Sequence, residues 1–172
     1  MARLGTKFAL AASLALMAAA CAKKPPADAG PPPGPAEPAQ PGDTSGVTDA
    51  PVPGSQADFL AKVSSDRVFF DLDQFDIDAE DRATLDSQAA WLKQYPRVRV
   101  TIEGHADERG TREYNLALGE RRANSAKNYL ATLGIDASRI STISYGKERP
   151  DALGSDEASW ARNRRAVTVT VQ

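Results

Sequence analysis

Apolar and polar residues follow strand and helix periods only in the C-terminal two thirds of this chain. The clearest strand signal is in residues 97–103, where Val98, Val100 and Ile102 alternate with polar residues. Strict alternation is typical of a strand with one buried face. Residues 166–171 alternate in the same way and place three valines on one face. Two shorter apolar runs complete the set, so the predicted strands are 68–72, 97–103, 140–145 and 166–171.

Apolar residues at helical spacing predict two long helices between these strands. The first follows Asp78, a favourable N-cap, and runs to about Tyr95, where Pro96 ends it. The second begins near Glu113 and ends at Gly134. A short helical turn is expected at 157–162. This order predicts an α/β (α+β) sandwich, with one mixed sheet of about four strands and helices on one face.

The first twenty residues have the pattern of an export signal. Basic residues precede an apolar run of about thirteen residues, which is too short for a membrane span. Small residues then lead to Cys21, the only cysteine. They resemble a lipobox, in which Cys21 would carry a lipid anchor. Ala18 stands where a lipobox usually has Leu, so cleavage by an ordinary signal peptidase stays an alternative.

Residues 21–55 have the composition of a tether. Ten of the twelve prolines lie between Pro25 and Pro53, with few large apolar residues among them. Such a segment buries too little apolar surface to offset the entropy of ordering, and its prolines keep it extended. A proline-rich ligand for a partner domain is the alternative. One domain is expected to follow, in residues 56–172.

The composition and motifs of this domain argue against several classes of function. From Gln56 onward, 17 basic residues stand against 19 acidic ones, which argues against a nucleic-acid partner. His105 is the only histidine, for which we expect a structural hydrogen-bonding role. The acidic run from Asp71 to Asp78 lacks the glycine of a calcium loop. With no nucleophile set or nucleotide loop, we expect no enzymatic activity, no metal and no cofactor.

The strongest motif places two opposite charges fifteen positions apart. Asp107 lies in the loop sequence Gly-His-Ala-Asp-Glu-Arg-Gly (residues 104–110), followed by Tyr114-Asn115, and Arg122 lies in Arg-Arg-Ala-Asn (residues 121–124). A carboxylate and a guanidinium that converge can hold a zwitterion, or they can form an internal salt bridge. Together these motifs resemble the OmpA C-terminal-like family of peptidoglycan-binding domains.

The resemblance implies roles for individual residues. Asp107 would take the ammonium, and Arg122 the carboxylate, at the side-chain end of diaminopimelate in the peptidoglycan stem peptide. Gly104 is expected in the ligand loop, where glycine lets a ligand come close. The remaining groove residues that the resemblance implies are Phe70, Asp71, Arg109, Thr111, Leu118 and Arg164.

The resemblance also implies a cellular role. By analogy with family members that serve the Tol system, we expect a lipid-anchored outer-membrane protein whose domain faces the periplasm. It would bind peptidoglycan, TolB and other Tol proteins, and support membrane constriction at cell division. Ala22 in place of Asp favours outer-membrane sorting. The alternatives are a wall anchor in another envelope machine, such as a stator or secretion complex, and a wall-modifying hydrolase.

Overall fold

The computed structural model describes residues 50–171. The predicted signal segment and Cys21, with most of the predicted tether, lie outside these residues. Within them, no helix has both the length and the apolar character needed to cross a membrane. The elements in chain order are α1 (Gln56–Lys62), β1 (Arg67–Phe69), α2 (Ala79–Gln94), β2 (Arg99–His105), α3 (Arg112–Thr132), the 3-10 turn η1 (Ala137–Arg139), β3 (Ile140–Gly146), α4 (Glu157–Asn163) and β4 (Arg165–Val171).

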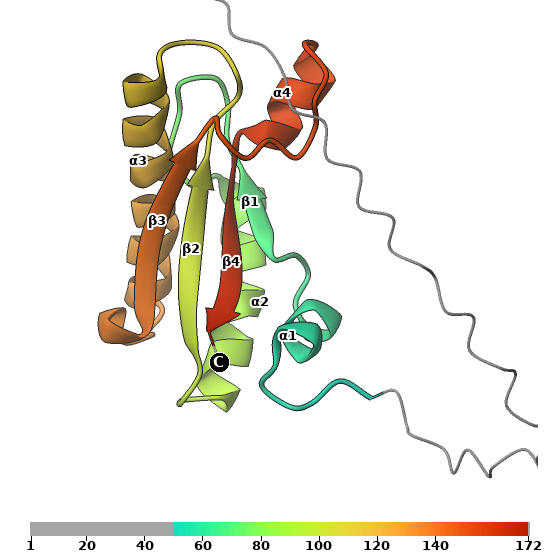
Figure 1. Ribbon diagram of the computed structural model, residues 1–172. Helices are drawn as coiled ribbons and strands as arrows, with labels where there is room; N and C mark the ends of the chain where they lie inside the picture. The colour runs from blue at the N-terminus through green and yellow to red at the C-terminus, as the bar shows by residue number, and fades with distance from the viewer. Residues whose placement is uncertain (1–49, 172) are drawn as a thin grey trace, which may run out of the picture. The chain divides into compact units, whose positions relative to one another are not determined.

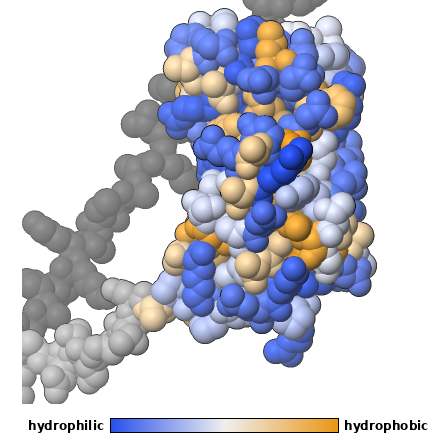
Figure 2. Space-filling model, turned by 180° about the vertical axis from the view of Figure 1, so that it is seen from behind, coloured by the Kyte–Doolittle hydropathy of each residue, from blue (hydrophilic) through white to orange (hydrophobic). Residues whose placement is uncertain are grey.

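Four strands form one mixed sheet in the order β1-β4-β2-β3. Strand β2 is parallel to β3, whereas β4 runs antiparallel to both β1 and β2. Helices α2 and α3 cover one face of the sheet and lie behind it in Figure 1, while α4 stands at one end of the strands. The outer surface of the molecule on this helix side is mostly hydrophilic, with small separate hydrophobic patches (Figure 2). The predicted architecture is therefore confirmed.

The core lies between the sheet and the two long helices. Val100 and Ile102 of β2 are fully buried there, as their alternation predicted. The helices contribute apolar stripes that include Leu85 and Leu92 of α2 and Leu130 of α3. Asp78 caps α2 by accepting a hydrogen bond from the Asp81 N–H, as predicted. The helix and strand periods of the sequence thus arise from a single shared core.

Strand β4 turns its threonines, rather than its valines, toward the helices. Ala166 and Thr168 are buried on the helix-facing side, whereas Val171 on the opposite side is half exposed. The Thr168 hydroxyl donates to Gln88 Oε1 at 2.8 Å, and the Gln88 amide donates to the Ser65 carbonyl at 2.9 Å. Because both polar side chains are paired, they can be buried at little cost. The valines do share one face, but it is the face without helices.

One helix and several boundaries differ from the sequence-based expectation; β2, for example, spans Arg99–His105 instead of residues 97–103. The seven-residue helix α1 was not predicted, because it is too short to show an apolar period. Strand β1 ends at Phe69 instead of residue 72. The chain turns immediately afterwards: Asp73 has a positive φ of 57°, and the Gln74 N–H donates to the Asp71 carbonyl at 3.1 Å. This turn carries the loop between β1 and α2 toward α3.

Gly104 lies in β2 and not in the following loop, which corrects the expected placement. A Cβ atom at Gly104 would overlap the carbonyl of Gly119 in α3, and one at Gly119 would meet the Ser144 hydroxyl. The two glycines therefore allow α3 to cross the sheet at backbone contact. Gly104 serves this packing, and it does not line the pocket that holds Asp107 and Arg122.

The close crossing predicts a large cost for a methyl group at this position. Replacing Gly104 with Ala should lower the free energy of unfolding by about 2–3 kcal/mol. The added methyl group would overlap the Gly119 backbone, which cannot move aside as a side chain could. Urea titration measures this change. Gly134→Asn is the comparison, because Gly134 has open space around it and its positive φ, which asparagine adopts more readily than most residues, is the only source of strain. Equal midpoints for the two variants and the wild type would contradict the packing role.

His105, at the end of β2, has no hydrogen bond to its ring. Among residues 50–171 neither ring nitrogen has a hydrogen-bond partner, although Nε2 lies 3.7 Å from Glu103 Oε2. The hydrogen bond that His105 does make comes from its backbone, whose carbonyl accepts from Arg122 Nη1 at 2.8 Å. The ring is buried and lies 5.6 Å from the Tyr145 ring, centre to centre. Burial, together with the nearby positive charge of Arg165, lowers the pKa of His105 to about 4.

This lowered pKa predicts a loss of stability in mild acid. The unfolded chain takes up the histidine proton near pH 6.5, before the folded state does, so stability falls as the pH decreases through that value. Between pH 7 and pH 5 the free energy of unfolding should fall by about 2 kcal/mol. His105→Phe should remove most of this fall, because His105 is the only histidine. Parallel pH profiles for the two proteins, measured by urea unfolding, would contradict this assignment.

Candidate functional site

A pocket of about 310 Å³ opens where β2 ends and α3 begins. Three segments that are far apart in the sequence meet there: the loop after β1, the loop between β2 and α3 with the first turns of α3, and the end of α4. The lining residues are Leu72, Asp73, Ala106, Asp107, Arg109, Gly110, Tyr114, Asn115, Leu118, Arg122 and Arg164.

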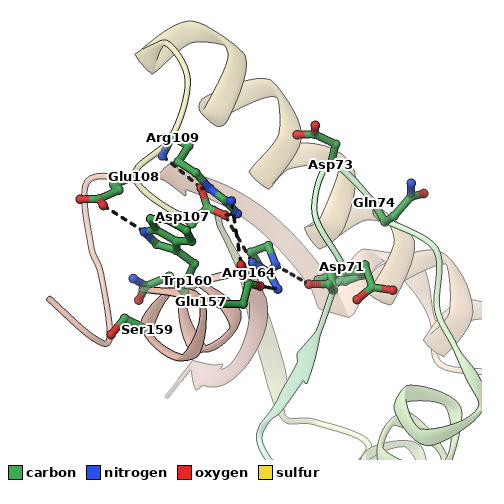
Figure 3. Close-up of polar contacts among 12 residues, drawn as sticks. Asp71, Asp73, Gln74, Asp107, Glu108, Arg109, Glu157, Ser159, Trp160 and Arg164 are labelled. Atoms are coloured by element: carbon green, nitrogen blue, oxygen red, sulfur yellow. Dashed lines mark hydrogen bonds and ion pairs between the residues drawn. The ribbon is translucent and has the colours of Figure 1, made fainter. Parts of the chain in front are cut away.

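Asp107 is a buried carboxylate that is held by two arginines. Its Oδ1 accepts from the Arg109 backbone N–H at 3.0 Å and from Arg109 Nε at 3.2 Å, and its Oδ2 accepts from Arg109 Nη2 at 2.6 Å (Figure 3). Arg164 Nη1 adds an ion pair at 3.5 Å. Burial on its own would raise the pKa of Asp107, but the Arg109 hydrogen bonds and the two positive charges lower it. The carboxylate is therefore ionised at neutral pH.

Arg122, on α3, is a fully buried cation that is held by backbone carbonyls. Its Nε donates to the Gln74 carbonyl at 2.8 Å, Nη1 to the His105 carbonyl at 2.8 Å, and Nη2 to the Asp71 carbonyl at 3.0 Å. Burial and the charge of Arg164 lower its pKa to about 10, so the side chain stays protonated at neutral pH. No carboxylate of residues 50–171 lies within 4.0 Å of its nitrogens.

The expected convergence of Asp107 and Arg122 is therefore indirect. Both line one pocket, but they do not form the internal salt bridge that was the alternative, because Asp107 pairs with Arg109 instead. Asp107 lies in the loop between β2 and α3, whereas Arg122 lies on α3, so the two charges stay apart. A pocket with a buried anion and a separate buried cation can receive a ligand that carries both opposite charges.

Arg164 follows α4 and connects the pocket to its surroundings. Its Nε donates to the Phe70 carbonyl at 2.9 Å, and its Nη2 donates to Glu157 Oε1 at 2.8 Å. The buried Nη1 faces Asp107 but has no hydrogen-bond partner in the described part of the chain. This nitrogen is available to a ligand acceptor in the pocket.

A larger neighbouring concavity of about 640 Å³ shares Arg164 with this pocket. Phe70 and Asp71 line it, so they lie next to the charged pocket and not in it. Although this concavity is twice as large, it contains neither Asp107 nor Arg122. The presence of both opposite charges, Asp107 and Arg122, therefore identifies the smaller pocket as the candidate site.

The remaining expected residues divide into lining and supporting positions. Arg109, Leu118 and Arg164 line the pocket with the two charged residues. Thr111 does not line it; its hydroxyl caps α3 by accepting from the Tyr114 N–H at 3.2 Å. Capping explains the choice of threonine, and α3 accordingly begins at Arg112 rather than at Glu113.

Sequence reasoning missed several residues of the pocket. Buried Asn115 donates from Nδ2 to the Arg109 carbonyl at 2.8 Å and so fixes the loop. The Tyr114 hydroxyl donates to Asp73 Oδ1 at 3.1 Å and links α3 to the loop after β1. Tyr114-Asn115 belongs to the motif that the sequence displayed, so its position directly after the charged loop was the available signal. Nothing in the sequence indicates Leu72.

Residues 50–171 contain no group of three or more His, Cys, Asp or Glu side chains that could hold a metal ion. The acidic residues after β1 have different hydrogen-bond partners. Asp78 caps α2, and Asp73 accepts from Tyr114.

Comparisons with known proteins agree with this arrangement. The OmpA family model matches residues 69–164. A peptidoglycan-associated lipoprotein of Rhizobium meliloti is 55% identical over 132 residues, which cover 75% of this chain and 74% of that protein. The protein of the same name from Brucella melitensis is 54% identical over 128 residues, covering 74% and 76%.

A solved structure gives the same result. The crystal structure of the peptidoglycan-associated lipoprotein from Burkholderia pseudomallei superposes with a TM-score of 0.61 at 45% identity. The match covers 66% of this chain and 93% of that one. The matched family segment runs from β1 to Arg164 and includes the entire lining of the charged pocket. The resemblance read from the motifs is confirmed, and the chain belongs to the OmpA family.

Proposed function

We propose that this chain binds peptidoglycan non-covalently by holding the side-chain end of diaminopimelate in the charged pocket. That end carries an ammonium and a carboxylate on one carbon. Asp107 accepts from the ammonium, and Arg122 donates to the carboxylate. The observation that carries the proposal is the fully buried Arg122 guanidinium, which lines a pocket and has no acidic partner among the described residues.

The energetics of a buried cation favour this ligand. Leaving a guanidinium without a counter-ion in a dry site is costly, and a ligand carboxylate removes that cost. A guanidinium has five N–H groups, and three of those on Arg122 donate to carbonyls, so two remain for a ligand. Arg164 Nη1 offers a further donor beside Asp107. A ligand with both charges therefore satisfies groups on both sides of the pocket.

The comparisons support a binding role rather than catalysis. The relatives from Rhizobium meliloti and Brucella melitensis are named peptidoglycan-associated lipoproteins, and neither name denotes an enzyme. We carry peptidoglycan association from those names to this chain because the segment that lines the pocket lies within the matched family region.

The remaining parts of the chain complete the proposal. Residues 1–20 direct export, Cys21 carries the lipid anchor in the outer membrane, residues 21–55 form the tether, and residues 56–172 bind the wall from the periplasmic side. An extended tether of this length reaches at most about 100 Å. Tethering raises the local ligand concentration, so modest affinity is sufficient. TolB and other Tol proteins are the proposed partners, and support of constriction at division is the proposed cellular role.

The first prediction of this proposal concerns the carboxylate. Asp107→Asn should weaken binding to purified sacculi by at least about tenfold, or about 1.4 kcal/mol, because it removes the charge that receives the ammonium. A pull-down with quantified free protein measures this change. Asp86→Asn is the matched control, since exposed Asp86 bonds to Tyr129 and lines neither pocket. Undiminished binding by folded Asp107→Asn protein would remove Asp107 from the site.

The second prediction concerns the ligand. Stem peptides with lysine in place of diaminopimelate keep the ammonium but lack the carboxylate that Arg122 requires. They should bind at least about tenfold more weakly, since two N–H groups then stay unpaired. Calorimetric titration with the two peptides measures this ratio. Equal affinities would mean that Arg122 receives no ligand carboxylate.

A further inference from the structure

The ammonium-binding carboxylate is already occupied by a side chain of the protein. Arg109 donates three hydrogen bonds to the two oxygens of Asp107, the shortest at 2.6 Å. Two of them come from its guanidinium and form a bidentate pair, the strongest geometry for such contacts. A ligand ammonium can take the two acceptor positions that the guanidinium holds only if this guanidinium moves away. Arg109 therefore competes with the ligand for the same acceptor.

The surroundings of Arg109 provide a second position for its guanidinium. Its central carbon lies 4.1 Å from the centre of the Trp160 ring, over whose face the cation is stabilised. Glu157, one turn earlier on α4, places Oε2 at 4.0 Å from Arg109 Nη1. Figure 3 shows Arg109 and Asp107 near the α4 side chains Trp160 and Glu157. A small rotation can thus exchange one carboxylate partner for another.

A hydrogen bond orients the Trp160 ring. Its indole N–H donates to Glu108 Oε1 at 2.9 Å, which ties α4 to the same loop that carries Asp107 and Arg109. The side chains differ in exposure: Asp107 is 5% exposed, Arg109 34% and Glu157 67%. The buried partner thus holds Arg109 in the absence of a ligand, and the exposed partner lies at the rim of the site.

We propose that Arg109 determines the specificity of the pocket by occupying the ammonium position until a doubly charged ligand displaces it toward Glu157. This inference depends on the proposed function. A simple amine only replaces one charged partner of Asp107 with another, so it gains little. A ligand that also carries a carboxylate gains the contacts with Arg122 and Arg164. Arg109 therefore acts against ligands that offer a positive charge alone.

A double-mutant cycle on the full chain tests the exchange of partners. With meso-diaminopimelate as the probe, Arg109→Gln should bind at least about threefold more tightly, because the competitor is removed. Glu157→Gln should bind about threefold more weakly, since the displaced guanidinium loses its second partner. In the Arg109→Gln background, Glu157→Gln should have a clearly smaller effect, and the part that remains comes from its hydrogen bond with Arg164. Weaker binding by Arg109→Gln, or an equal Glu157→Gln effect in both backgrounds, would overturn the proposal.

Cadaverine, a diamine without carboxylates, tests the specificity directly. Arg109→Gln should bind cadaverine at least about tenfold more tightly than the wild type does. The ratio of the affinities for meso-diaminopimelate and cadaverine should therefore be smaller in this variant. Arg112→Gln is the matched control, because exposed Arg112 pairs with Glu148 at 3.1 Å and lies outside the pocket. An unchanged ratio of the two affinities in Arg109→Gln would contradict the role of Arg109.

The NMR signals of the tryptophan indole N–H groups distinguish this exchange of partners from a loss of structure. The described domain has two tryptophans, and only Trp160 lies next to Arg109, so its indole N–H signal should shift when meso-diaminopimelate is added. Asp107→Asn should abolish that shift. If Asp107→Asn leaves ligand binding intact, the proposed function fails; if binding needs Asp107 but the cycle shows no coupling, only the role of Arg109 fails.

Discussion

The buried guanidinium of Arg122 is the interaction on which both the site and its surroundings depend. It joins three carbonyls that the chain supplies from separate places: Asp71 and Gln74 in the loop after β1, and His105 at the end of β2. Without this cation, three carbonyl acceptors would lose their donors, and the loop would keep only the Tyr114–Asp73 hydrogen bond as a side-chain attachment to α3. The charge that organises the backbone is thus the charge that faces the pocket.

The acidic side of the pocket is organised differently. Asp107 obtains its partners mainly from side chains, because the Arg109 guanidinium donates to it and Arg164 adds an ion pair. Carbonyl partners fix Arg122 in place, whereas side-chain partners can be exchanged. The pocket therefore combines a fixed cation with an anion whose partners are replaceable. This asymmetry follows from the contacts, and under the proposed function it lets a tightly packed fold admit a charged ligand.

Much of this arrangement could be predicted from the sequence. The alternation around Val100 and Ile102 predicted β2, and Asp78 and Pro96 marked the limits of α2 to within about two residues. The motif led us to expect that Asp107 and Arg122 converge, and both line one pocket. These features could be predicted because side-chain periodicity, helix capping and proline positions are properties of the sequence itself.

Other features carry no such signal. The partners of Arg122 are backbone carbonyls, which every residue possesses, so no sequence pattern identifies them. The choice between Arg109 and Arg122 as the partner of Asp107 depends on side-chain geometry across the loop. Gly104 was expected in that loop, but its need for a hydrogen side chain arises from Gly119 on another element. The burial of Thr168 could not be predicted either, because its hydrogen-bond acceptor, Gln88, lies on another element, α2.

The most direct measurement is the structure of the chain in complex with a stem peptide that contains diaminopimelate. The account predicts that the side-chain ammonium lies on Asp107, that the carboxylate lies on Arg122, and that the Arg109 guanidinium has left Asp107. A complex in which the diaminopimelate lies elsewhere, or in which Arg109 and Asp107 stay paired beside the bound ligand, would contradict it.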